Sequence, residues 1–141
     1  MKLDKLLRTD YIQATEHWKE TYRRFSEVDD LWDYIPIDKV PVKKIRIDKS
    51  LLDYPNDVNE DNVTYMINNF QNDVWDAIMV NDNFSVLDGQ HRLRLAERTG
   101  LKYIDVIMKM KKTPELSKKI RNHLKFEKKY KEEIAKLGIV L

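Results

Sequence analysis

The residue types most able to do chemistry stand together at positions 88–92, which read Asp-Gly-Gln-His-Arg. A short apolar segment precedes them and a segment with helical spacing follows, so the glycine falls where a strand turns into a helix. The first N–H groups of such a helix have no partner, and with the helix dipole they attract anions. His91 and Arg92 fall in the first helical turn, where a cation gains nothing from the dipole. The stretch therefore predicts a phosphate-binding turn.

A simpler interpretation of the same side chains stays open. In this interpretation Arg92 pairs with a carboxylate, while His91 caps a neighbouring element or packs against it. Arg94 is a further candidate phosphate ligand, although together with Arg98 it also fits a solvated outer face of the helix. The sequence has no cluster with metal-ligand spacing and no Ser–His–Asp arrangement.

The composition is that of a soluble globular protein of about one domain. The chain has 141 residues, of which 42% are hydrophobic and 35% charged. It has no cysteine, which excludes disulfides, thiolate catalysis and cysteine-based zinc sites. No apolar run approaches the roughly 18 residues that span a membrane, and the first residues lack the apolar segment of a signal peptide. We therefore expect a cytoplasmic protein without a membrane partner.

Charge is distributed unevenly along the chain. The net charge is +2, but residues 109–136 hold 11 Lys and Arg against 4 Glu and so carry +7. Residues 1–108 hold 15 basic and 20 acidic side chains and carry −5. The lysines of this segment are expected to form the solvated face of a long helix. The alternative is that the segment binds the DNA backbone, as a basic end on an acidic body suggests.

The apolar patterning predicts an α+β order of elements. Helical spacing covers about the first 25 residues, whereas residues 31–41, with two prolines, are expected to form a connector. Asn59 is a predicted N-cap, and the helix after it has an apolar face formed by Val63, Met66, Ile67 and Phe70. The other expected elements are strands at 42–47, 77–80, 84–87 and 103–108, a helix at 90–99 that ends at Gly100, and a long helix from Thr113.

These elements divide the chain into three expected regions. An N-terminal helical arm and connector occupies residues 1–39, a core with a small mixed sheet and helices occupies 40–110, and a basic C-terminal helix occupies 111–141. The helical arms are expected to pack on the core or on each other. Their remaining apolar positions allow an oligomer without requiring one.

The core resembles the ParB/sulfiredoxin superfamily from about Val40 to Met108, half of the chain. Three features carry the resemblance: the turn at 88–92 between a strand and a helix, the helix with the apolar face at 63–70, and the Ile-Met-Val strand at 78–80. The turn is also similar to that of the DGQHR-domain branch, which includes DNA phosphorothioation regulators. The resemblance implies a ParB/sulfiredoxin-like core that binds a nucleotide, in a DNA-binding protein of bacterial, phage or plasmid type.

The resemblance also implies a role for each residue of the turn. Gly89 allows a close approach of a phosphate, Gln90 offers a backbone N–H, and both His91 and Arg92 donate to phosphate oxygens. Arginine supplies a planar fork that matches phosphate. Asp88 holds Mg²⁺ directly or through water. The expected ligand is a nucleoside di- or triphosphate, CTP or ATP, bound with Mg²⁺ and hydrolysed slowly if at all.

The sequence departs from the superfamily at several points. Sulfiredoxins place their catalytic cysteine where this chain has Gln90, which excludes their chemistry. ParB proteins carry a Pro-Ile-x-Val-Arg strand, whereas residues 77–81 of this chain read Ala-Ile-Met-Val-Asn. The second nucleotide motif of ParB is not evident after Met108. The behaviour of a CTP-dependent clamp is therefore not expected.

One further position and three functions follow from the resemblance. Asp57 ends a Pro-Asn-Asp segment that falls where related serine kinases have Pro-His-Glu. This position makes Asp57 a candidate catalytic base. The alternative is that Asp57 only forms a turn.

The leading function is that of a nucleotide-binding protein in DNA transactions. The alternatives are a small phosphotransferase or nuclease that uses Asp57 and Asp88, and a non-enzymatic DNA- or protein-binding module.

Overall fold

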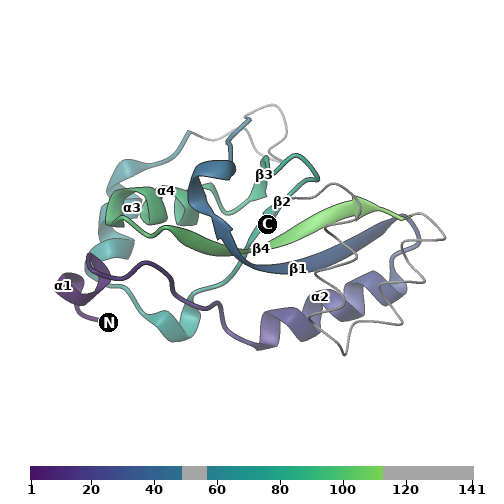
Figure 1. Cartoon of the computed structure of the whole chain (residues 1–141), viewed down its shortest axis with the longest axis horizontal. Helices are drawn as coiled ribbons and strands as arrows, with labels where there is room; N and C mark the ends of the chain where they lie inside the picture. The colour runs from purple at the N-terminus through teal and green to yellow at the C-terminus, as the bar shows by residue number, and fades with distance from the viewer. Residues whose placement is uncertain (49–56, 113–141) are drawn as a thin grey trace.

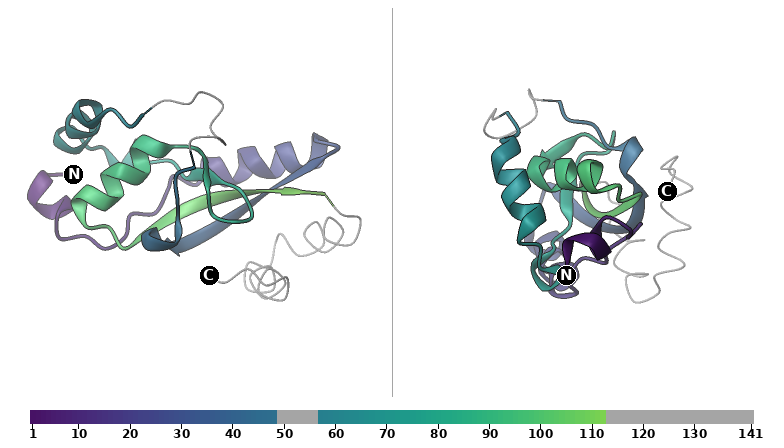
Figure 2. Two further views of the ribbon diagram at one scale, coloured as in Figure 1. Left: turned by 90° about the horizontal axis from the view of Figure 1, so that it is seen from above. Right: turned by 90° about the vertical axis from the view of Figure 1, so that its left-hand side faces the viewer.

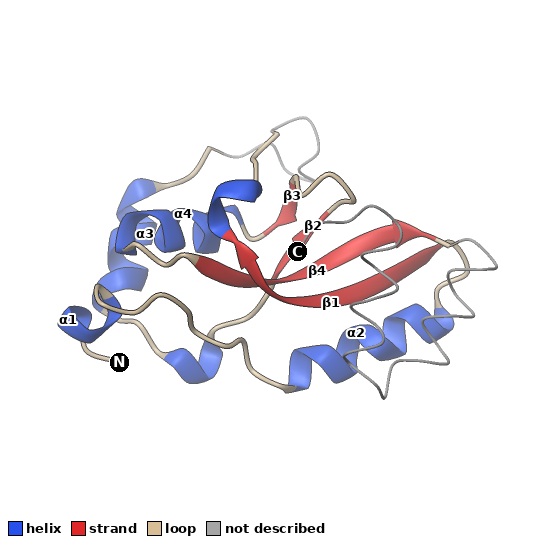
Figure 3. Cartoon of the chain, viewed as in Figure 1, coloured by secondary structure: helices blue, strands red, loops and turns tan. Residues whose placement is uncertain are grey.

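The computed structural model describes residues 1–48 and 57–112 (Figure 1). In chain order the elements are α1 (Leu3–Leu6), α2 (His17–Val28), β1 (Trp32–Pro41), the 3₁₀-helix η1 (Val42–Lys44), α3 (Glu60–Asn68), the 3₁₀-helix η3 (Asn72–Val74), β2 (Ile78–Val80), β3 (Val86–Asp88), α4 (Gln90–Thr99) and β4 (Tyr103–Lys111). The strands form one mixed sheet in the order β1-β4-β2-β3 (Figure 3). The α+β class expected from the sequence is confirmed. Within the described part of the chain, no helix has both the length and the apolar character to cross a membrane.

The longest pairing in the sheet joins β1 to β4. The two strands run antiparallel, from Trp32 opposite Lys111 to Pro41 opposite Tyr103. The prediction of a connector at 31–41 is therefore wrong, and β1 runs across the boundary expected after residue 39. β1 is an edge strand, where a proline is tolerated because not every N–H is needed for pairing. Its alternation of buried and half-buried residues is that of a strand.

The remaining elements confirm most local predictions and correct one. β2 and β3 form the expected antiparallel hairpin, and β2 pairs parallel with β4. α3 begins after Asn59, whose side chain accepts the N–H of Asn62 at 3.1 Å, as an N-cap does. The prediction of a strand at 42–47 is wrong, because η1 takes its place. Val42 and Ile45 are both buried and stand three residues apart, a spacing that a 3₁₀-turn brings to one side.

The two faces of the sheet are covered by different helices. Ile35 and Val106 belong to the large core cluster with residues of α3 and α4, whereas Ile107 packs with Ala14 and Trp18. Because side chains alternate along a strand, these clusters lie on opposite faces of the sheet. α2 thus covers one face and packs on β1, while α3 and α4 lie side by side at the other (Figure 2). We call the face under α2 the α2 face.

A buried carboxylate on the α2 face joins the N-terminal segment to the sheet. Asp105 of β4 has no exposed surface. Its carboxylate accepts hydrogen bonds from the Tyr11 hydroxyl at 2.7 Å, the Ala14 N–H at 2.8 Å and the Lys39 N–H at 3.1 Å. Lys39 has a positive φ of 54°, and the register of β1 shifts at this position. Asp105 therefore holds both the irregular point of β1 and the segment that leads into α2.

The ionisation of this pair follows from its burial. Burial raises the pKa of Asp105, and the hydrogen bonds from Ala14, Tyr11 and Lys39 oppose the rise. Burial also raises the pKa of Tyr11, with the hydrogen bond to Asp105 as the next cause. The Tyr11 hydroxyl consequently stays protonated and remains a donor to Asp105.

A second carboxylate stabilises the turn between α2 and β1. Asp29 Oδ1 accepts the N–H groups of Leu31 at 2.8 Å and Trp32 at 2.9 Å. Ser26 Oγ accepts the Tyr34 N–H at 2.8 Å, which supplies a partner for a donor of the edge strand. These bonds fix the C-terminal half of α2 along β1.

Replacing Asp105 by asparagine is expected to destabilise the fold by about 1–3 kcal/mol. The amide nitrogen of asparagine is a donor and would replace one of the two acceptor oxygens of the carboxylate. At least one of the three groups that donate to Asp105 would then be buried without an acceptor. Chemical denaturation of Asp105→Asn and wild type measures the difference in the free energy of unfolding. Tyr11→Phe is the control, because it removes one donor and leaves the carboxylate paired with the other two. An Asp105→Asn protein as stable as wild type would contradict this role.

The stability of the fold is also expected to depend on pH through Asp29. The N–H groups of Leu31 and Trp32 hold the pKa of Asp29 below its usual value. Such a carboxylate stabilises the fold at pH values above its pKa in the unfolded chain, which is about 3.9. This stabilisation is lost as the pH falls through the lower pKa of the folded state. The difference in the free energy of unfolding between wild type and Asp29→Asn should therefore shrink from about pH 6 towards about pH 3. A constant difference over this range would count against the assignment.

Candidate functional site

The expected turn from a strand into a helix is present. β3 ends at Asp88, Gly89 is the N-cap residue, and α4 begins at Gln90. Gly89 has a φ of 104°, in the left-handed region that favours glycine. Gly89 has no side chain that could cap the start of α4. The first backbone N–H groups of this helix therefore receive no bond from an N-cap side chain.

Gly89 is also required by packing against the sheet. The residue is buried, and a Cβ atom built on it would lie 2.6 Å from Cγ2 and 2.9 Å from Cβ of Ile78 in β2. The absence of a side chain at Gly89 thus allows the start of α4 to lie close to β2. Its role in the approach of a phosphate stays a prediction.

Arg92 lies at the same end of α4, with 26% of its side chain exposed. Its Nη1 donates to the carbonyl oxygen of Ala77, just before β2, at 2.7 Å. Its Nη2 lies 3.9 Å from Asp88 Oδ2, and the Asp88 side chain is 75% exposed. A guanidinium carries several N–H donors in a planar fork, so these two contacts leave donors for another acceptor. The simpler interpretation expects Arg92 to pair with a carboxylate. Asp88 is such a partner, but the distance between the charged atoms is long.

His91 connects the starts of two helices. Its Nε2 accepts the backbone N–H of Asn59, the N-cap residue of α3, at 3.1 Å. Nε2 is therefore without a proton in this arrangement, and Nδ1 carries it. The ring atom that remains to donate to an anion is Nδ1. The contact to Asn59 is of the kind that the simpler interpretation of His91 expects.

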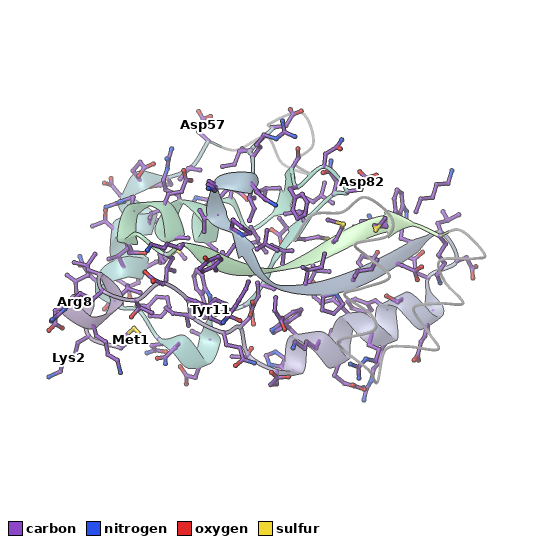
Figure 4. The ribbon with its side chains drawn as sticks, in the orientation of Figure 1. Met1, Lys2, Arg8, Tyr11, Asp57 and Asp82 are labelled. Atoms are coloured by element: carbon purple, nitrogen blue, oxygen red, sulfur yellow. The ribbon has the colours of Figure 1, made fainter. Side chains whose placement is uncertain are left out.

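The other two candidate residues lie further from the turn. Arg94 Nε is 2.8 Å from Glu60 Oε1, and Arg98 Nη1 is 3.3 Å from Glu60 Oε2, so both arginines tie α4 to α3. Asp57 stands two residues before Asn59, and its side chain points outward from the edge of the molecule (Figure 4). Roles for Arg94 and Asp57 stay predictions. The basic helix expected from Thr113 lies outside the described residues.

A cavity of about 280 Å³ lies beside the turn. Its walls come from α2, from the residues that enter β2, and from the turn itself. The polar residues among them are His17, Thr21, Tyr22, Asp76, Asp88 and Arg92. The cavity therefore lies on the α2 face, and it joins two residues of the predicted turn to residues that are distant in the sequence.

The charges around this cavity are mixed. Burial raises the pKa of Tyr22, the Asp88 carboxylate adds to the rise, and Arg92 opposes it. Asp76 contributes a further, smaller rise. Two carboxylates thus accompany a single guanidinium. Within residues 1–48 and 57–112, no three His, Cys, Asp or Glu side chains gather into a group that would hold a metal ion alone.

Sequence reasoning missed the residues that complete the cavity. Asp76 directly precedes the predicted strand at 77–80, and a carboxylate next to the start of a strand is a signal that could have pointed to it. Thr21 and Tyr22 belong to a helix whose apolar spacing predicts packing but not its partner. No local pattern relates α2 to the turn, because the two are distant in the sequence and come together only in the folded chain.

Gly89→Ala is expected to cost about 2 kcal/mol or more in stability, because a positive φ and a clash with Ile78 act together. Gly100→Ala is the matched control: Gly100 has a φ of 80° but no heavy atom within 4 Å of a built Cβ. This control isolates the backbone strain, which is about 1–2 kcal/mol. Thermal or chemical unfolding of both variants measures the difference. Equal losses would show that contact with Ile78 contributes nothing.

Comparison with known proteins finds similarity to solved structures. No family model and no curated protein matches the chain. The chain is similar to two solved structures of a pNOB8-like ParB N-domain, one of them in a C2221 crystal form. The identities are 19% and 17% and the TM-scores 0.40 and 0.42. Each match covers 55% of this chain, and the chain spans only 30% and 28% of the length of those chains.

Proposed function

We propose that the turn at 88–92 binds the phosphates of a nucleoside di- or triphosphate, in a protein that acts on DNA. The observation that carries the proposal is the meeting of two sets of donors at one place. The uncapped N–H groups of α4 start at Gln90, and the guanidinium of Arg92 lies within the first turn of the same helix. Both kinds of group are suited to phosphate oxygens.

The position of Arg92 supports this function. Its bond to the Ala77 carbonyl holds the guanidinium at the start of α4 before a ligand arrives. The Asp88 carboxylate is mostly exposed and 3.9 Å away, and ion pairs of this kind contribute little to stability. A phosphate can therefore replace or join this contact at small cost. Arginine held in place loses less freedom on binding than a free surface side chain would.

The surrounding carboxylates make Mg²⁺ part of the proposal. Asp76 and Asp88 line the cavity beside the turn and would repel a phosphate. Mg²⁺ is commonly bound by one or two carboxylates together with phosphate oxygens and waters, so a complete protein cage is not needed. Asp88 fits as the protein ligand, because it is exposed and directly precedes the turn. Mg²⁺ bound there would neutralise charge between Asp88 and the phosphates.

The DNA part of the proposal is supported by charge. Residues 109–136 carry +7, and their first lysines, Lys109 and Lys111, belong to the end of β4. Lysines of this density favour contacts with the phosphate backbone, which weaken steeply with rising salt. Most of this basic stretch lies outside the described residues.

A thermal-shift panel tests the nucleotide site. CTP, ATP, GTP and ADP are each added to wild type with and without Mg²⁺. A ligand at 100 times its Kd stabilises the fold by about 2.7 kcal/mol, which moves Tm by several degrees. We expect one or more nucleotides to raise Tm only with Mg²⁺, and Arg92→Ala to abolish the shift.

Arg98→Ala is the control, since it removes the same charge from the same helix at a residue that contacts Glu60 and Thr64. This variant should keep the shift. The absence of a shift with every nucleotide in wild type, or an equal loss in both variants, would overturn the proposed function.

A further inference from the structure

We propose that the cavity between α2 and the start of α4 binds the ribose of the nucleotide, with the Asp76 carboxylate as the acceptor for a sugar hydroxyl. The inference rests on the proposed function, because it places the sugar next to phosphates bound at the turn. It adds residues of α2 and of the entry to β2 to the site. It also gives the site a preference for ribonucleotides over deoxyribonucleotides.

The chemistry of the cavity suits a sugar better than a phosphate. A carboxylate only accepts hydrogen bonds, so the cavity needs donors from its ligand. The 2′- and 3′-hydroxyls of ribose are such donors, and each also accepts a bond from a hydroxyl such as that of Tyr22. Tyr22 belongs to α2 and lines the cavity. A carboxylate that binds ribose hydroxyls is also the arrangement used in dinucleotide-binding folds.

Asp76 is held in a fixed orientation. The Thr15 hydroxyl donates to Asp76 Oδ1 at 3.1 Å, and Thr15 Oγ1 lies 3.2 Å from Nδ1 of His17. If the hydroxyl donates to Asp76, it accepts from the protonated Nδ1 of His17, so one chain of bonds runs from the imidazole to the carboxylate. Thr15 N–H also donates to the Trp75 carbonyl at 3.1 Å, which fixes the backbone before Asp76. Oδ2 is the oxygen left to face a ligand.

Position and size agree with this occupant. Asp88 and Arg92 belong both to the turn and to the cavity wall, so a ligand with its phosphates at the turn extends into the cavity. The volume of about 280 Å³ lies at the small end of ligand pockets and fits a sugar better than a whole nucleotide.

Calorimetric titration of the full chain tests the inference. The probes are ATP and CTP, their 2′-deoxy and 3′-deoxy forms, and inorganic tripolyphosphate, all with Mg²⁺. We expect wild type to bind a ribonucleotide about tenfold more tightly than at least one of its deoxy forms, as for one hydrogen bond to a charged group. Asp76→Asn should bring the two affinities together by weakening the ribonucleotide alone.

Asp73→Asn is the matched control. Asp73 is an exposed carboxylate of η3, three residues before Asp76, and it does not line this cavity. The Asp73→Asn variant loses the same charge as Asp76→Asn and should keep the preference for ribose. Because the preference is also measured in wild type, the test does not depend on the folding of a variant.

The other outcomes overturn the inference in distinguishable ways. Equal affinities for ribo- and deoxyribonucleotides in wild type, with tripolyphosphate bound, would overturn the sugar site and leave the phosphate site. Tighter binding of every probe by Asp76→Asn would show that Asp76 only repels phosphate. A higher requirement for Mg²⁺ in that variant, with the sugar preference kept, would make Asp76 a metal ligand. No binding of any probe would overturn the proposed function as well.

Discussion

The arrangement around the turn depends on the buried carboxylate of Asp105. Ala14, one of its donors, directly precedes Thr15, and Thr15 contacts both Asp76 and the carbonyl of Trp75. α2 begins two residues later. The carboxylate therefore determines where α2 starts on the sheet, and with it one wall of the cavity beside Arg92. A charge buried for structural reasons in β4 thus decides the shape of a site formed by other elements.

The turn itself combines demands that usually compete. Its backbone must be open to a ligand, yet its residues must be held in place without one. The fold meets both demands by securing the side chains through backbone groups of neighbouring elements: Arg92 through the carbonyl of Ala77, and His91 through the N–H of Asn59. Contacts between ionised side chains contribute little to this arrangement, because the pair with Asp88 is long and exposed.

The parts of the structure that the sequence predicted are those with local signals. The N-cap at Asn59, the hairpin before Asp88 and the glycine turn each depend on residues within a few positions of one another. β1 was missed because its prolines suggest a connector, and only its place at the sheet edge makes them acceptable. The cavity was missed for another reason: α2 reaches it through packing on β1, which no spacing within α2 encodes.

The contact between Gly89 and Ile78 has a mechanical consequence. A Cβ atom at this glycine would already overlap the strand, so α4 cannot settle closer to β2. The site is therefore stiff in the direction of the sheet and yields only away from it. A ligand that pushes the start of α4 towards the sheet therefore presses on Ile78 and so on β2. Since β2 pairs parallel with β4, such a load passes directly to β4, whose last residues lead into the basic end of the chain.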